Sequence, residues 1–330
     1  FAFYNIDLIS ERTVEEIQED IAYFKQLYPD RRFIGSIMAA GEDEWIELVH
    51  RLEEAGADMI ECSMSCPQGE HSIADEGKKA SNAIPAADRE LMRTTTQTIL
   101  RARKKNTPVI VKMTPNVTDL VDVARGAVEG GADALCCIDT VRGFIGINLE
   151  TGYPKLNVNG LSTWGGLSGP AVKPIALGCV SKLTKELDIP VAGVGGVSNW
   201  QDAAEFLLLG ARNVQVCTAI SRYGFGMVQS MQKGLLRYME QKGFTSLDAM
   251  VGKSLPYLVD HSELSRDNHL HCSIDETACL KCGSCATACQ DAGFGALHHE
   301  KGSVPTLDKA VCRGCGVCQS VCPRDCITLR

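Results

Sequence analysis

Residues 109–140, VIVKMTPNVTDLVDVARGAVEGGADALCCIDT, decide the fold expected for this chain. The apolar run Val109–Met113 has the length of a buried strand, and apolar residues then recur at helical spacing over Thr118–Glu129. Gly131 supplies a C-cap for that helix before a second apolar run, Ala134–Ile138. A strand, a helix and a strand joined by short turns predict a βα unit of a parallel sheet.

The same pattern recurs on both sides of this unit. Strands are predicted at Phe33–Met38, Met59–Met64, Val109–Met113, Ala134–Ile138, Val191–Val194 and Val214–Cys217. Helices are predicted between them at Glu44–Glu54, Ala87–Lys104, Thr118–Glu129, Ala171–Glu186 and Asn199–Leu209. The helix-to-strand junction repeats as Gly56-Ala57-Asp58, Gly131-Ala132-Asp133 and Gly210-Ala211-Arg212. Repetition on this scale favours a (β/α) barrel, with an open doubly wound sheet as the alternative.

The flanks of this region set the expected domain limits. A capping-box pattern at Thr13 and Glu16 predicts a helix before the first strand, and Met227–Lys242 forms a last helix. A closed barrel has eight strands, and only six are predicted here. We therefore expect that two βα units are absent from the front of the chain as given. We expect a TIM-type barrel domain over residues 1–251, a linker over 252–270 and a ferredoxin-like domain over 271–330.

The cysteines carry the strongest signal. Eight of the 16 form two copies of C-x-x-C-x-x-C-x-x-x-C, typical of two [4Fe-4S] clusters in which the fourth cysteine of each run binds the other cluster. The predicted ligand sets are Cys279, Cys282, Cys285 and Cys322 for one cluster, and Cys312, Cys315, Cys318 and Cys289 for the other. Tetrahedral zinc is the alternative for paired C-x-x-C motifs. The extra Cys272 and Cys326 are interpreted as packing residues.

Composition excludes several classes of protein. A net charge of −8 with 45% hydrophobic residues is that of a folded chain, without the basic footprint of a nucleic-acid-binding protein. No stretch approaches the about 20 apolar residues of a membrane-spanning helix. We therefore expect neither nucleic acid nor a membrane as a partner. Cysteines clustered at metal-ligand spacing indicate a reducing compartment, and a cytoplasmic location is expected.

Polar residues and glycines follow the predicted strands, at the barrel end where such folds hold their sites. They are Ser63–Gly69, Lys112–Asn116, Asp139-Thr140, Gly195-Gly196 and Cys217-Thr218, and Gly165–Gly169 is a second candidate anion cradle. With the clusters, this array predicts FMN, because a flavin combines hydride chemistry with single-electron exchange. The sequence has no dinucleotide-binding fingerprint, so another subunit is the expected electron source.

Several motifs resemble one family. They are Asn5–Glu11, Ser65-Cys66-Pro67, Lys112–Asp119, Gly166–Gly169 with Pro174–Leu177, and the paired ferredoxin motifs. Together they span nearly the whole chain and resemble dihydropyrimidine dehydrogenase, specifically its FMN barrel and C-terminal ferredoxin segment, and more distantly the dihydroorotate dehydrogenases. The resemblance implies a hetero-oligomer in which an FAD-containing flavoprotein passes electrons from NAD(P)H through the clusters to FMN. It implies reduction of the 5,6 double bond of a pyrimidine, a step of pyrimidine catabolism.

The resemblance also implies roles for single residues. Cys66 matches the family's loop cysteine, a general acid, and a thiol with a pKa near ~8.5 is mostly protonated at about pH 7. Lys112 matches a lysine beside the flavin ring. The implied FMN contacts are Lys112, Gly169, Val194, Gly195, Gly196, Cys217 and Thr218. The implied substrate contacts are Asn5, Ser63, Asp139 and Thr140.

Two positions depart from the family, since Ser63 and Asp139 each stand where it has asparagine. An asparagine donates and accepts, as the edge of a pyrimidinedione requires, whereas an ionised aspartate only accepts. We therefore expect a small nitrogen heterocycle other than uracil. The alternative functions are an electron-transfer module that bridges a partner and another enzyme, or a related reductase acting on a different cyclic amide.

Overall fold

The computed structural model describes residues 1–6, 10–39, 41–64, 86, 88–265 and 270–330. The chain divides into two compact units, Phe1–Leu258 and Val259–Arg330. Residues just after the predicted barrel limit of 251 still pack on the first unit, because the Gly252 and Ser254 amides donate to the Leu207 and Leu208 carbonyls. Among the helices described, none has the length and apolar character needed to cross a membrane.

The first unit is built on a six-stranded parallel sheet whose strands lie in the order β2-β3-β4-β5-β8-β9. Their bounds are Ile34–Ile37, Met59–Ser63, Val109–Met113, Ala134–Cys137, Val191–Val194 and Asn213–Gln215. All six predicted strands are confirmed, with ends that differ by a few residues. The strands follow one another in chain order, without the reversal that defines a doubly wound sheet.

Helices connect these strands in a single layer. They are α1 (Val14–Leu27), α2 (Glu42–Ala55), α3 (Arg89–Ala102), α4 (Leu120–Gly130), α5 (Lys173–Glu186) and α6 (Trp200–Leu208), followed by α7 (Thr218–Tyr223) and α8 (Gly226–Lys242). From α1 to α6 each helix contacts the next one along the chain, as on the outside of a barrel. The predicted capping box is present at α1, where Thr13 accepts from the Glu16 amide and Glu16 accepts from the Thr13 amide.

The sheet is strongly curled. Gln215 Nε2 on β9 donates to Glu61 Oε2 on β3 at 3.0 Å, although three strands lie between them. In a flat sheet these strands would stand about 19 Å apart, since neighbouring strands are spaced by about 4.8 Å. Side chains on the concave face therefore meet across the sheet. The TIM-type fold class is confirmed, as a parallel half-barrel, and the doubly wound alternative is wrong.

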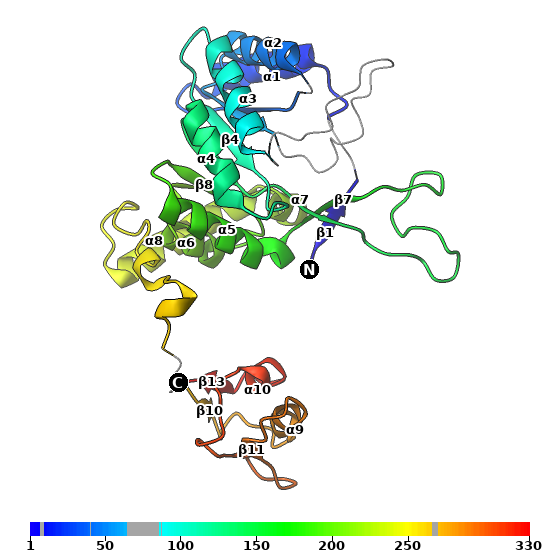
Figure 1. The fold of residues 1–330 in the computed structure, drawn as a ribbon, viewed down its shortest axis with the longest axis vertical. Coiled ribbons are helices and arrows are strands. Elements are labelled where there is room, and N and C mark those ends of the chain that lie inside the picture. Colours follow the sequence, from blue (N-terminus) through cyan, green and yellow to red (C-terminus); the bar gives the residue numbers. More distant parts are fainter. Residues whose placement is uncertain (7–9, 40, 65–85, 87, 266–269) are drawn as a thin grey trace. The chain divides into compact units, whose positions relative to one another are not determined.

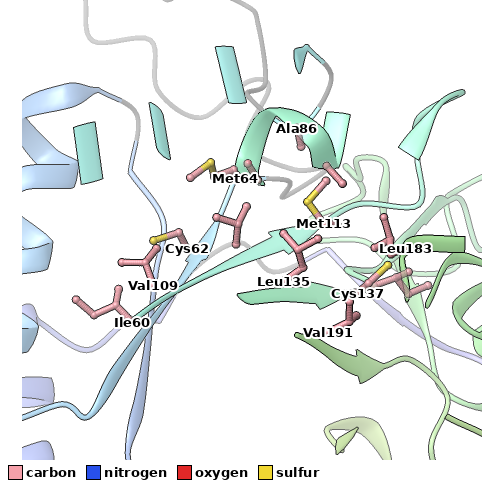
Figure 2. Packing of buried hydrophobic residues seen from close by; sticks show 14 of the residues in the cluster. Ile60, Cys62, Met64, Ala86, Val109, Met113, Leu135, Cys137, Leu183 and Val191 are labelled. Atoms are coloured by element: carbon pink, nitrogen blue, oxygen red, sulfur yellow. The ribbon is translucent and has the colours of Figure 1, made fainter. Parts of the chain in front are cut away.

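The apolar core lies between the convex face of the sheet and the helices. Residues at alternate strand positions point into it, including Ile60 and Cys62 on β3 and Val109 on β4 (Figure 2). All three are fully buried. Their neighbours one position along, such as Glu61, point to the concave face because side chains alternate along a strand. This alternation sets the polar groups of the barrel interior apart from the core.

The repeated Gly-Ala-Asp junction has a structural explanation. Gly56 and Gly131 end α2 and α4 in the left-handed conformation, with φ of 89° and 95°. The aspartate two residues later accepts a hydrogen bond from a backbone amide at the start of the neighbouring strand. Asp58, before β3, accepts from the Phe33 amide before β2 at 2.7 Å, and Asp133, before β5, accepts from the Val109 amide of β4 at 2.8 Å. Each junction thus holds two neighbouring strands in register.

Asp58 also accepts hydrogen bonds from Lys25 at 2.7 Å and from Arg32 at 3.1 Å. Burial alone would raise the pKa of Asp58, but the hydrogen bonds from Lys25 and the Phe33 amide outweigh it and lower this pKa to about 2. A carboxylate with a lowered pKa stabilises the fold above the pKa of an unfolded aspartate, about 3.9, and this contribution is lost as the pH falls toward the folded value.

Asp58→Asn is expected to lower the free energy of unfolding by about 2 kcal/mol at neutral pH, because hydrogen bonds to a charged acceptor are weakened. About half of this difference disappears by about pH 3. Urea unfolding followed by tryptophan fluorescence measures it, since Trp45, Trp164 and Trp200 all lie in the first unit. Asp30→Asn, at an exposed position, is the control and should change little. A difference that stays constant down to pH 3 would contradict the explanation.

A second, antiparallel sheet was not predicted. It has the order β1-β7-β6, with β1 at Phe3–Asn5, β6 at Val141–Gly143 and β7 at Gly165–Ser168. Figure 1 shows the segment between β6 and β7 extending away from the rest of the first unit. The predicted anion cradle Gly165–Gly169 is therefore mostly strand, and only its last glycine lies in a turn.

The described residues of the second unit, 259–265 and 270–330, form two short antiparallel strand pairs and two short α-helices. β10 (Cys272–Ile274) pairs with β13 (Ile327–Leu329), and β11 (Leu297–His298) pairs with β12 (Thr306–Leu307). Each Cys-x-x-Cys-x-x-Cys loop leads into a helix, α9 (Ser284–Asp291) or α10 (Val317–Ser320). Cys289 lies on α9, whereas Cys322 follows two residues after α10.

Candidate active site

The predicted site residues of the barrel gather where the parallel strands end. Ser63 at the end of β3 is in register with Lys112 on β4, and Lys112 is in register with Cys136 on β5. Residues in register on parallel strands point to the same face, so these three side chains line the concave side. Asp139 follows two residues after β5, and its carboxylate accepts from the Thr140 amide at 2.7 Å.

Lys112 lies in a charged network that was not predicted. Its Nζ is 3.5 Å from Glu61 Oε1, and Glu61 also accepts from Gln215. The Glu61 side chain is only 6% exposed. Burial lowers the pKa of Lys112, but the carboxylates of Glu61 and Asp139 outweigh this effect, so its pKa is raised overall. Lys112 is therefore a protonated cation at the end of β4.

The sequence did contain a signal for Glu61. It lies in the middle of the strand MIECS, where an unpaired carboxylate is costly to bury, so a charged partner on a neighbouring strand was to be expected. Which partner it has depends on the register with β4 and on the curl that brings Gln215 close. Burial and the charge of Glu61 raise the pKa of Cys136 as well, so this thiol stays neutral.

Glu61→Gln is expected to lower the free energy of unfolding of the first unit by about 3 kcal/mol, because it removes a charged partner of the half-buried Lys112. Combining it with Lys112→Met should cost clearly less than the sum of the two single changes. Urea unfolding followed by tryptophan fluorescence measures all four proteins of this cycle. If the effects of the two changes on the free energy of unfolding were additive, the Glu61–Lys112 pair would contribute nothing to stability.

The glycines predicted to bind FMN come together at the ends of β7 and β8. A Cβ on Gly196 would lie 2.9 Å from the Gly169 carbonyl oxygen and 2.8 Å from the Lys173 amide nitrogen. Gly195 and Gly196 have φ of 127° and 77°, which L side chains rarely adopt. Only glycine fits this close approach of backbone segments, which leaves the main chain accessible to an anion. The residues present therefore fit the phosphate end of FMN.

Thr218, the first residue of α7, joins this group from beyond the end of β9. Its hydroxyl is 2.8 Å from Ser168 Oγ, which links the start of α7 to the end of β7. Val194 is the last residue of β8, and the exposed Cys217 immediately precedes α7. All the predicted FMN contacts thus lie at strand ends on one edge of the half-barrel.

Asn5 and Thr140, predicted to contact substrate, both lie against β7. Asn5 is in register with Gly166, and a Cβ on Gly166 would lie 2.3 Å from Thr140 Oγ1. Asn116, to which no role was assigned, fixes the backbone around Thr140. Its Nδ2 donates to the Thr140 carbonyl at 3.0 Å, and its Oδ1 accepts from the Arg142 amide at 2.9 Å. Cys66, the predicted general acid, lies outside the described residues.

In the second unit the cysteines surround two cavities. One is lined by Cys279, Cys282, Cys285, Cys322 and Cys326. The other is lined by Cys272, Cys289, Cys312, Cys315 and Cys318. The fourth cysteine of each run therefore faces the cavity of the other run, and spaces surrounded by four or more thiols fit [4Fe-4S] clusters. Cys272 and Cys326, interpreted from sequence as packing residues, are part of the cavity walls.

Comparison with known proteins agrees with both units. The family model described as dihydroorotate dehydrogenase matches residues 9–239, well over half of the chain. The chain belongs to the dihydroorotate dehydrogenase family. A second model, described as a 4Fe-4S dicluster domain, matches residues 272–329 of this family member. Zinc, the alternative for the paired cysteine motifs, is thereby excluded.

Three relatives in this family are similar to most of the chain. The NAD-dependent dihydropyrimidine dehydrogenase subunit PreA of Escherichia coli K12 is 39% identical over 99% of this chain and 78% of its own length. The chloroplastic dihydropyrimidine dehydrogenase (NADP(+)) of Arabidopsis thaliana is 36% identical over 79% of this chain and 61% of its own. The catalytic subunit of dihydroorotate dehydrogenase B (NAD(+)) of Methanothermobacter thermautotrophicus is 39% identical over 74% and 75%, respectively.

The resemblance to dihydropyrimidine dehydrogenase is thus confirmed. This member of the dihydroorotate dehydrogenase family is an oxidoreductase that acts on CH–CH bonds. Its cofactors are FMN and two [4Fe-4S] clusters.

Proposed function

We propose that this chain reduces the C=C bond of a pyrimidine-like nitrogen heterocycle, with electrons delivered through its clusters by a separate NAD(P)H-oxidising flavoprotein subunit. The observation that carries the proposal is the joining of a dihydroorotate dehydrogenase barrel and a dicluster domain in one chain, over residues 9–239 and 272–329. The Escherichia coli relative matched over 99% of this chain is itself named a subunit of an NAD-dependent enzyme. A cluster domain is of use when electrons arrive one at a time from a partner.

The proposed flavin site consists of Lys112, Val194 and the strand ends that hold Gly169, Gly195, Gly196, Cys217 and Thr218. When bound, FMN supplies hydride chemistry toward the substrate and single-electron exchange toward the clusters. Lys112, kept protonated by Glu61 and Asp139, offsets negative charge at the inner end of this site. The close packing of Gly169 and Gly196 supports backbone binding of the phosphate.

The proposed substrate site adjoins Lys112. Ser63 lies beside it in register, and the carboxylate of Asp139 is close enough to raise its pKa. Asn5 and Thr140 adjoin β7 on the neighbouring edge. This set combines an amide, two hydroxyls and a carboxylate, which suits a ring whose edge carries N–H donors as well as an acceptor. Cys66, three residues after Ser63 in the sequence, is the proposed proton donor.

The decisive experiment asks whether a heterocycle takes electrons from the flavin. The purified full chain is reduced with light under anaerobic conditions, and the return of oxidised flavin absorbance is followed after addition of dihydropyrimidine precursors with oxo, amino or imino substituents. Rapid reoxidation by at least one ring, with formation of the dihydro product, supports the proposal. Reoxidation by none of the rings, together with rapid electron exchange with a partner flavoprotein, would favour an electron-transfer module.

The crossed ligand sets lead to a prediction for Cys289. This thiol, the fourth cysteine of the first run, lies on α9 but faces the cavity of Cys312, Cys315 and Cys318. Cys289→Ala is expected to remove the electron paramagnetic resonance (EPR) signal of that second cluster and about half of the bound iron, since each cluster has four ligands. Loss of the cluster held by Cys279, Cys282 and Cys285 instead would overturn the crossing. The EPR signal of the second cluster is identified as the one that is lost in Cys312→Ala.

A further inference from the structure

Each cluster cavity has five cysteines on its wall, one more than a cubane cluster binds. In the first cavity the extra cysteine is Cys326, which is 8% exposed. Its Sγ lies 3.3 Å from Sγ of Cys322. A disulfide requires about 2.05 Å between sulfurs, so the two are thiols in contact. The two sulfurs therefore occupy the same corner of the cavity.

The backbone holds Cys326 firmly in this position. The Asp325 amide donates to the Cys322 carbonyl at 3.3 Å, and Asp325 has a φ of 49°, so the chain turns back after Cys322. The Cys326 carbonyl accepts from the Asp275 amide at 2.8 Å, and β13 begins at the next residue. A free cysteine needed only for packing does not have to be placed against a cluster ligand in this way.

We propose that Cys326 is a second, interchangeable ligand for the corner of the first cluster that Cys322 occupies. This inference rests on the ligand sets proposed above. In the exchange, the iron–sulfur bond to Cys322 breaks and a bond to Cys326 forms. The proton of the Cys326 thiol passes to Cys322, and the oxidation state of the iron does not change. While Cys322 is the ligand, the Cys326 S–H donates a hydrogen bond to it.

The two extra cysteines are not equivalent. Cys272, on the wall of the second cavity, interacts with Cys318, a member of the Cys-x-x-Cys-x-x-Cys loop. It lies on β10, before the first cysteine run, whereas Cys326 comes after the last cysteine of the second run. The proposal therefore concerns one corner of one cluster, and Cys289→Ala has no equivalent rescue.

The test compares alanine variants of the full chain by iron content and by EPR of the reduced protein. Cys322→Ala should retain both clusters, with a changed line shape for the first. Cys322→Ala combined with Cys326→Ala should lose the first cluster and about half of the iron, because only three thiols remain. Cys285→Ala, which removes another corner of the same cluster, is the matched control and should lose the cluster as a single change.

The outcomes separate the two levels of the inference. If Cys322→Ala loses the first cluster as completely as the double variant, Cys326 is not a ligand, while the ligand set with Cys322 stands. If the double variant keeps both clusters, the ligand set itself is wrong. Should Cys322→Ala fail to fold, Cys326→Ala alone decides, because it keeps all four proposed ligands. It should bind full iron but lose its visible absorbance several-fold faster in ferricyanide and chelator, and an unchanged rate would overturn the proposal.

Discussion

Cys66→Ala is expected to slow substrate reduction by about 10² to 10⁴, the usual contribution of a positioned general acid, while FMN stays bound. In the sequence, Cys66 comes three residues after Ser63, at which β3 ends beside Lys112. A thiol of ordinary pKa, near ~8.5, is mostly protonated at about pH 7 and has a proton to donate. Loss of the thiol therefore affects the chemistry and not flavin loading.

Stopped-flow measurement separates the rate of flavin reduction from the rate of substrate reduction. Flavin reduction through the clusters is followed first, and reoxidation by the heterocycle is followed second, so that only the second rate should fall in Cys66→Ala. The control is Cys62→Ala, since Cys62 is fully buried in the core and burial raises its pKa above the usual range. An unchanged reoxidation rate in Cys66→Ala would mean that this thiol only packs.

Activity on uracil is expected to be weak in the wild type and to rise about 10²-fold in kcat/KM when Asp139→Asn is combined with Ser63→Asn. Pairing a ring carbonyl with an ionised carboxylate leaves both acceptors unsatisfied, which costs about 3 kcal/mol once water is excluded. The amides restore donors at both positions. The carboxylate also lies near Lys112, whose pKa it helps to raise.

The assay compares uracil with an amino- or imino-substituted ring in all four combinations of the two substitutions. Preference should reverse between the wild type and the double variant, and each substrate is the control for the other. Efficient uracil reduction by the wild type at about pH 8, unchanged in the double variant, would exclude these positions as the specificity determinants.

The local features of this protein were predictable from its sequence. Short apolar runs and helical spacing identified the six parallel strands and the helices between them, because these patterns depend on neighbours a few residues apart. Cysteine spacing identified two cluster-binding runs for the same reason, and it predicted that Cys289 and Cys322 exchange partners. Glycines and polar residues at strand ends indicated the site, because parallel strands bring their carboxyl ends to one edge.

Contacts between distant segments were decided only by the tertiary structure. The hydrogen bond from Gln215 to Glu61 depends on the curl of the whole sheet, and 154 residues separate the two. The pairing of β1 with β7, which brings Asn5 to Gly166, likewise joins segments far apart in the chain. The sequence indicated that Cys326 is a packing residue, whereas in the structure its sulfur lies 3.3 Å from that of Cys322. No local periodicity records such contacts, because they follow from how strands, turns and side chains fill three-dimensional space together.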